Sequence, residues 1–328
     1  MRVWRGAWRR AADALERGRA APWAGARLAS LVYERAAAAR LDRDARRPRG
    51  PGRVVAVFGA TLGGSWRTPL ALALAEALAG RGLRVGFVAH GYGGRASARG
   101  RLAGAGSDPR EVGDEASLAA RRLGAIDVPV LVGRARDEAW PALSGRCVVV
   151  DGGPGPPRAS GLRVLALDGP KPWGAGACPP AGDLRAPAAA LEASADLVVR
   201  IWDELDAAAA GPDDATYGLA LPGGLGGASA GVVTAIARPE RFVRALRRRG
   251  VEPRLHVELA DHAGPGAARA LDAALARLPT RPDVLLTTEK CKVWLPARAA
   301  GVPLLAVPCA LRPPRALVDR VAEALARA

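Results

Sequence analysis

The sequence predicts an α/β protein in which a doubly wound parallel sheet is followed by a second, smaller α/β lobe. From Val54 onward, short apolar runs of strand length alternate with longer segments whose apolar residues recur at helical spacing. This alternation is typical of parallel sheets that helices cover on both faces. A glycine-rich passage, 211–231, interrupts the alternation, which then resumes. The interruption divides the predicted fold into a core and a second lobe.

The first segment, 1–50, is predicted to be basic and amphipathic and to end in a linker that contains proline and glycine. Its tryptophans and Leu28, Leu31 and Val32 are interleaved with arginines. This pattern suits a helix that lies on an anionic membrane surface. A solvated helix packed against the main domain explains it equally well, so both interpretations remain open.

The core is predicted over 51–210 and the second lobe over 211–328. In the core, apolar runs predict strands at 54–58, 84–89, 129–132, 147–151, 163–167 and 197–201, with helices at 69–80 and 115–123. In the second lobe, the same criteria predict strands at 232–236, 254–258 and 283–287, and helices at 239–249, 265–278 and 314–327. The final helix is expected either to stay with this lobe or to pack back on the core.

The chain is strongly basic, with a formal net charge of +16. Such a charge is usual in proteins that bind nucleic acid or anionic membranes. However, only Lys171, Lys290 and Lys292 among the 48 basic residues are lysine, and alanine, glycine and proline are abundant. This bias indicates GC-rich coding. Since the sequence contains no zinc finger, RNA-recognition motif or basic–aromatic platform, nucleic acid is not expected as a partner.

The four cysteines are far apart and form no Cys-x-x-Cys pair. They predict reduced thiols in a cytosolic compartment rather than a metal cluster. The sequence also contains no run of eighteen apolar residues that could cross a bilayer.

The segment 63–69, Gly-Gly-Ser-Trp-Arg-Thr-Pro, lies between the first predicted strand and the first predicted core helix. In this context, backbone N–H groups and a helix N-terminus can hold a phosphate. The segment therefore predicts a nucleotide-binding loop made of Gly63, Gly64, Ser65, Arg67 and Thr68. A loop of this kind usually ends Gly-Lys-Thr/Ser, so Trp66 and Arg67 stand where glycine and lysine are expected.

Seven further segments stand in order along the chain: 22–33, His-Gly-Tyr-Gly-Gly-Arg at 90–95, Val-Gly-Asp-Glu at 112–115, Pro-Ala-Gly-Asp-Leu-Arg-Ala-Pro at 180–187, Ala-Ile-Ala-Arg-Pro-Glu-Arg-Phe at 235–242, Asp-His at 261–262 and Thr-Thr-Glu-Lys at 287–290. Together with the loop they resemble, in order, the motifs of the tetraacyldisaccharide 4′-kinase family, the lipid A kinases of Gram-negative bacteria. The resemblance covers most of the chain.

The resemblance implies a fold similar to that of P-loop NTPases. It also implies transfer of the γ-phosphoryl group of ATP, with Mg²⁺, to the 4′-hydroxyl of a tetraacylated disaccharide 1-phosphate at the cytoplasmic face of the inner membrane. Such a transfer needs a phosphate cradle, a cation and a base for the hydroxyl. By the resemblance, the base is Asp114 aided by His262, the Mg²⁺ ligands are Thr68, Glu115 and Asp151, and the residues near the lipid are Tyr92 and Arg185.

Each of these residues also has an ordinary structural explanation. Asp114 could be the N-cap of the helix at 115–123, with Glu115 favoured by the helix dipole. Asp151 could be a turn residue at the end of a strand, and Tyr92 a turn aromatic between glycines. His262 alone would be a surface histidine, and Lys290 alone a solvated charge.

The chain departs from the family pattern mainly at the nucleotide and Mg²⁺ positions. Trp66 occupies a position where glycine permits a positive φ, at a cost of ~1–3 kcal/mol. Arg67 keeps the charge of lysine but not its shape. Gly152 replaces the second carboxylate of an Asp-Asp-Gly motif that also loses its Gln and His. Further differences from the family's Arg, Glu and His occur at His90, Ala186 and Ala263.

Three hypotheses follow from these departures. The chain is a divergent but working lipid kinase, or it is a non-catalytic relative that keeps a lipid- or partner-binding surface. The third hypothesis, a basic nucleic-acid-binding module, has no motif behind it. No pattern in the sequence predicts the oligomeric state.

Overall fold

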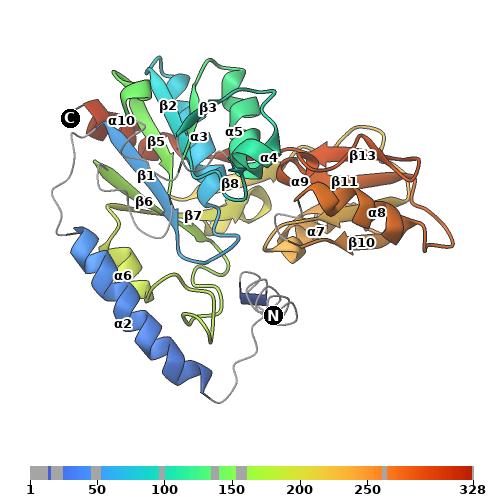
Figure 1. The fold of residues 1–328 in the computed structure, drawn as a ribbon, viewed down its shortest axis with the longest axis horizontal. Helices are drawn as coiled ribbons and strands as arrows, with labels where there is room; N and C mark the ends of the chain where they lie inside the picture. The colour runs from blue at the N-terminus through green and yellow to red at the C-terminus, as the bar shows by residue number, and fades with distance from the viewer. Residues whose placement is uncertain are drawn as a thin grey trace.

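The computed structural model describes residues 14–15, 25–45, 53–95, 100–133, 140–152, 161–260 and 264–326. These residues form two sheets, each with helices on both of its faces (Figure 1). The α/β class predicted from the alternation of apolar segments is confirmed. His262 and residues 1–13 and 16–24, which include Trp4, Trp8 and Trp23, lie outside the described residues.

The larger sheet is built mainly from the first two thirds of the chain. Its strands are β1 (Val54–Gly59), β2 (Val85–Ala89), β3 (Arg101–Ala103), β4 (Val130–Val132), β5 (Cys147–Asp151), β6 (Leu162–Asp168), β7 (Leu197–Asp203), β8 (Ala215–Leu219) and β14 (Cys309–Arg312). The accompanying helices are α2 (Ala26–Ala45), α3 (Arg67–Ala79), α4 (Pro109–Val112), α5 (Asp114–Gly124), α6 (Ala188–Ala193) and α10 (Arg315–Ala326), with 3-10 turns η2 (Trp140–Leu143) and η3 (Glu204–Ala209).

The strand order of this sheet, among the described residues, is β14-β8-β7-β6-β1-β5-β2-β4-β3. The strands from β8 to β4 run parallel, and β14 and β3 pair antiparallel at the two edges. The central strand β1 is buried along its whole length. Val55 and Val57 pack in one cluster with α3, α5 and α10, whereas Phe58 packs in another with α2 and α6. Burial on both faces explains why β1 reads as a continuous apolar run.

The smaller sheet forms the second lobe. Its strands are β9 (Ala230–Thr234), β10 (Leu255–Glu258), β11 (Val284–Thr288), β12 (Arg298–Ala299) and β13 (Val302–Val307), in the order β10-β9-β11-β13-β12. Its helices are α7 (Pro239–Arg247), α8 (Ala267–Leu275) and α9 (Glu289–Lys292), with the 3-10 turn η4 (Gly264–Gly266). Val232 packs with α7 and its neighbour Val233 with α8, so the two helices cover opposite faces.

The two sheets exchange chain segments. The glycine-rich passage 211–231 interrupts the predicted alternation of strands and helices, yet β8 lies within it and joins the larger sheet. The chain therefore enters the smaller sheet after β8, later than the boundary at 210, and returns with β14, which pairs with β8. The final helix α10 then packs with α3 on the larger sheet.

Helix α2 is held to the larger sheet by one face and exposes another. The hydroxyl of Ser30 donates to the carbonyl of Cys178 at 2.8 Å and accepts from the N–H of Ala181 at 3.1 Å. Leu28 and Val32 are 73% and 71% exposed on the same helix. Within the part of the chain that the structure describes, no helix is both long and apolar enough to span a membrane.

Candidate functional site

The predicted phosphate loop leaves the carboxyl end of β1 and enters α3, as its sequence context indicates. Gly64 has a φ of +64° and Trp66 a φ of +61°. Trp66 therefore adopts the left-handed conformation that glycine would permit at lower cost. Trp66 stands at the N-cap position of α3 without a side-chain cap. The backbone N–H groups that follow it are at the positive end of the helix dipole.

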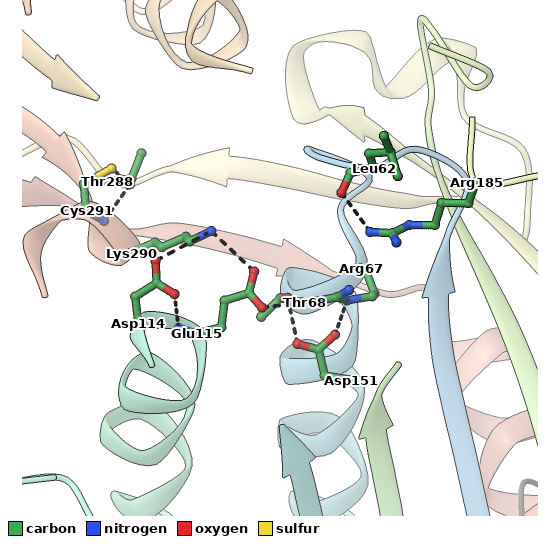
Figure 2. Close-up of polar contacts among 10 residues, drawn as sticks. All are labelled: Leu62, Arg67, Thr68, Asp114, Glu115, Asp151, Arg185, Thr288, Lys290 and Cys291. Carbon is green, nitrogen blue, oxygen red and sulfur yellow. Dashed lines mark hydrogen bonds and ion pairs between the residues drawn. The ribbon is translucent and has the colours of Figure 1, made fainter. Parts of the chain in front are cut away.

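Arg185, predicted to lie near the substrate, holds the start of this loop. Its Nε donates to the carbonyl of Thr61 at 2.7 Å. Its Nη2 donates to the carbonyl of Leu62 at 2.8 Å (Figure 2). The backbone N–H of Leu62 also donates to the carbonyl of Asp183 at 2.8 Å. The segment 183–185 is thus a support of the loop.

Arg67 binds the two carboxylates that were expected to hold Mg²⁺. Its Nε donates to Asp151, at the end of β5, and its Nη2 donates to Glu115 on α5 at 3.0 Å (Figure 2). The Thr68 hydroxyl donates to the second oxygen of Asp151 at 2.7 Å. Burial would lower the pKa of Arg67, but the charges of Asp151 and Glu115 outweigh it and raise that pKa. Arg67 is thus a permanent cation within an acidic cluster.

Lys290 brings a second cation to this cluster from α9 of the smaller lobe. Its Nζ lies 3.3 Å from Glu115 Oε1 and 3.8 Å from Asp114 Oδ2 (Figure 2). Seen alone in the sequence, Lys290 reads as a solvated charge, and that interpretation is wrong. The ion pairs place both lobes in contact with one acidic cluster.

Asp114 is the first residue of α5 and not its N-cap, because the cap position belongs to Gly113. Its carboxylate is 3% exposed and accepts from the N–H of Glu115 at 2.8 Å. Gly113 has a φ of +86°, and a Cβ there would lie 2.5 Å from the carbonyl oxygen of Tyr92. The glycine therefore permits a close backbone approach that brings the loop of Tyr92 against the start of α5.

Trp66 fills the space between the loop and the second lobe. Its indole Nε1 donates to Asp168 at the end of β6 at 2.9 Å, and its ring centroid lies 4.4 Å from that of Tyr217. Arg241 of α7 lies over the indole, donates to the carbonyl of Gly64 at 2.9 Å and pairs with Asp168 at 3.2 Å. The indole of Trp66 therefore contacts side chains from three different elements, β6, β8 and α7.

A cavity of about 490 Å³ lies between the two lobes. Its polar lining includes the whole loop 63–68, Glu115, Tyr92, Arg185 and Lys290. Its apolar lining includes Leu118 on α5, Leu219 on β8 and Phe242 on α7. The loop and α5 thus face one space that is large enough for a small-molecule ligand. The structure does not place His262 with respect to it.

The residues proposed for Mg²⁺ have suitable oxygen atoms, but these atoms are already engaged. Both oxygens of Asp151 and both of Glu115 bind Arg67, Thr68 or Lys290. Among the residues placed by the structure, no group of three or more His, Cys, Asp or Glu side chains is arranged to hold a metal ion. In this arrangement, the donor set does not fit a divalent ion.

The fold defines a P-loop-type α/β protein, in which the predicted phosphate loop lies at the carboxyl edge of the sheet. The family model described as tetraacyldisaccharide-1-P 4′-kinase matches residues 26–326. This chain therefore belongs to the tetraacyldisaccharide-1-P 4′-kinase family, as the ordered motifs of its sequence predicted.

Individual relatives agree with this membership. The chain is 36% identical over 312 residues to a tetraacyldisaccharide 4′-kinase of Methylobacterium radiotolerans, covering 90% of this chain and 92% of the relative. It is 33% identical over 274 residues to that of Pseudomonas aeruginosa, covering 77% of each chain. A crystal structure of LpxK from Aquifex aeolicus in complex with ATP shares the fold, with a TM-score of 0.65, 20% identity and coverage of 91% of this chain and 96% of that one.

Proposed function

We propose that this chain catalyses the reaction of its family, the transfer of the γ-phosphoryl group of ATP to the 4′-hydroxyl of a tetraacyldisaccharide 1-phosphate in lipid A biosynthesis. One observation carries the proposal: in a member of that family, the phosphate loop and Glu115, which follows Asp114 at the start of α5, line the same cavity. In the step, the hydroxyl oxygen bonds to the γ-phosphorus, the bond to the bridging oxygen breaks, and ADP leaves.

The proposed roles follow from position. Gly63, Gly64 and Ser65 belong to the phosphate loop, whose backbone and the α3 N-terminus hold the phosphates. Asp114 is the proposed base that accepts the proton of the 4′-hydroxyl, and the Nζ of Lys290 lies 3.8 Å from its Oδ2. His262 is the proposed partner of Asp114. Tyr92, which is 55% exposed and lines the cavity, is proposed to contact the lipid.

Mg²⁺ is the usual companion of ATP in such transfers, where it neutralises the developing charge on the phosphates. The resemblance assigned it to Thr68, Glu115 and Asp151. Because Arg67 occupies these carboxylates, no step of the proposed mechanism is assigned to the ion. The permanent positive charge beside the loop is the guanidinium of Arg67.

We propose that the protein meets its lipid substrate at the cytoplasmic face of the inner membrane, as a peripheral protein. Leu28, Leu31 and Val32 project from one helix into solvent, and Arg27 and Arg35 are exposed near them. Apolar side chains flanked by arginine favour insertion at an anionic interface. The ordered hydrogen bonds of Ser30 orient this face of α2 relative to the larger sheet.

One feature favours the second candidate, a non-catalytic relative that keeps a lipid- or partner-binding surface. Arg67 cross-links Asp151 and Glu115, so the acids expected to serve the nucleotide's metal ion serve an internal ion pair. The test is transfer of labelled γ-phosphate to a tetraacyldisaccharide 1-phosphate in detergent micelles. Product that depends on Asp114 supports the kinase, whereas absence of product, with an active relative in the same assay, supports the second candidate.

A further inference from the structure

The acidic cluster of the phosphate site is neutralised by side chains. Asp151 binds Arg67 through one oxygen and the Thr68 hydroxyl through the other. Glu115 binds Arg67 through Oε2 at 3.0 Å and Lys290 through Oε1 at 3.3 Å. The guanidinium therefore lies between the two carboxylates that a bridging cation would contact.

A divalent ion would have to displace that guanidinium. Mg²⁺ needs near-octahedral oxygen ligands at about 2.0–2.1 Å. Such a displacement would leave the guanidinium of Arg67, whose side chain is 15% exposed, without its two carboxylate partners, and a largely buried charge without a partner is strongly destabilising. The next residue along the chain cannot supply a further carboxylate ligand, because it is Gly152. A Cβ there would lie 2.7 Å from the carbonyl oxygen of Val57.

The identity of residue 67 explains why one side chain can hold both acids. A guanidinium is a planar fork with several donors, whereas the ammonium of lysine is a compact point charge. Arg67 uses Nε for Asp151 and Nη2 for Glu115. Its Nη1 has no hydrogen-bond partner among the described residues, and Arg67 lines the cavity next to the loop. One nitrogen thus remains for a phosphate oxygen while the carboxylates stay paired.

We propose that Arg67 is the resident cation of the phosphate site and that this chain binds ATP without a divalent metal ion. The inference rests on the proposed function, because it takes ATP as the ligand of the cavity. It concerns binding, so it is tested independently of turnover.

The experiment measures ATP binding to the full-length protein by titration calorimetry, once in EDTA and once in excess Mg²⁺. The wild type is expected to give dissociation constants within about threefold of each other, a difference below about 1 kcal/mol. In Arg67→Lys, the shorter cation releases at least one carboxylate, so Mg²⁺ is expected to tighten ATP binding by about tenfold or more. Arg81→Lys, two residues beyond the end of α3 and in a surface ion pair with Asp319, is the matched control and should behave as wild type.

Thermal unfolding with Mg²⁺ alone gives a second readout that needs no nucleotide. A ligand that binds the folded chain raises its melting temperature, so Mg²⁺ should raise that of Arg67→Lys and leave that of the wild type unchanged. Wild-type ATP binding that requires Mg²⁺ would overturn the inference and leave the proposed function standing. No ATP binding in either buffer would overturn both, and metal-independent binding without phosphoryl transfer would overturn only the proposed function.

Discussion

The guanidinium of Arg241 lies over the indole of Trp66, with its central carbon 4.7 Å from the ring centroid. Arg241 belongs to α7 of the second lobe, and Trp66 to the phosphate loop of the larger sheet. The same guanidinium donates to the carbonyl of Gly64 and pairs with Asp168, which accepts from the indole. Trp66, which replaces the glycine usual in such loops, therefore connects the loop to the second lobe.

We predict that Trp66→Gly destabilises the protein, although it restores the residue usual in such loops. The variant loses a tilted aromatic contact with Tyr217, a cation–π contact with Arg241 and a hydrogen bond to Asp168. These interactions contribute about 0.5–2 kcal/mol each, while relief of the left-handed conformation recovers about 1 kcal/mol. The free energy of unfolding in urea should fall by about 1–3 kcal/mol.

Trp66→Phe separates these contributions. It keeps a ring against Tyr217 and Arg241 but removes the indole N–H that Asp168 accepts. Its stability should lie between those of Trp66→Gly and the wild type. A glycine variant as stable as the wild type would show that the indole contacts contribute nothing net to the connection between the lobes.

We predict that Asp114→Asn abolishes phosphoryl transfer while leaving the fold intact. The amide keeps the shape and can still accept from the N–H of Glu115, but it cannot take a proton from the 4′-hydroxyl. Loss of a positioned base lowers kcat by about 10²–10⁴-fold. Asp127→Asn is the control, because Asp127 has a φ of +58° in the turn after α5, a conformation that asparagine tolerates. Equal rates for Asp114→Asn and the wild type would remove Asp114 as the base.

The interface between the lobes, where Arg249 just after α7 pairs with Asp203 at 2.8 Å and with Glu204 at 2.9 Å, should weaken in acid. Burial alone would raise the pKa of Asp203, but hydrogen bonds and charge from Arg249 outweigh it and hold that pKa below its ordinary value. A hydrogen bond from Arg249 likewise lowers the pKa of Glu204. Carboxyls with a lowered folded-state pKa stabilise the fold above their ordinary pKa of about 4, and this stability is lost as the pH falls through and below that value.

Urea unfolding at several pH values measures this loss. The wild type should keep its stability from about pH 7 to pH 5 and lose it steeply below about pH 4. Arg249→Gln should be less stable at neutral pH and lose less in acid, because its carboxyl partners then titrate closer to their ordinary pKa. Arg247→Gln removes an exposed pair with Glu252 and should keep the wild-type profile. Identical acid profiles for both variants would contradict the prediction.

The sequence predicts the central elements well because their signals are local. The continuous apolar run at Val54 and the glycine-rich turn after it define β1 and the start of α3 without knowledge of distant residues. The edge strand β3 has only three residues, two of them exposed, and β14 belongs to a sheet whose partner strand β8 lies far earlier in the chain. Such strands give no periodic signal that identifies their partners.

The same limit applies to the site. The sequence identifies Arg67, Asp114 and Glu115 as a group through motifs, but it cannot show which charges meet. Lys290 lies 175 residues from Glu115 along the chain, and only the packing of α9 against α5 brings them together. The partners of Trp66 likewise come from β6, β8 and α7. The sequence shows only that the usual glycine of the loop is missing, whereas the folded chain surrounds the indole with contacts.

The last prediction concerns Gly64, where a side chain should damage the loop more than positive φ alone explains. A Cβ at Gly64 would lie 2.2 Å from Cγ of Arg238. Arg238 cannot easily move, because its guanidinium pairs with the fully buried Asp183. Gly82 offers a matched control: its φ is +78°, and nothing lies within 4 Å of a Cβ there.

Gly82→Ala should therefore lower the free energy of unfolding by about 1 kcal/mol, the cost of alanine at positive φ. Gly64→Ala carries the same cost and adds the collision, so it should lower stability by about 2–4 kcal/mol. It should also weaken ATP binding by about tenfold or more, since the loop can relieve the contact only by moving away from Arg238. Because φ is positive at both positions, equal losses of stability in the two variants would show that Arg238 yields freely, and its ion pair with Asp183 would then not fix the loop.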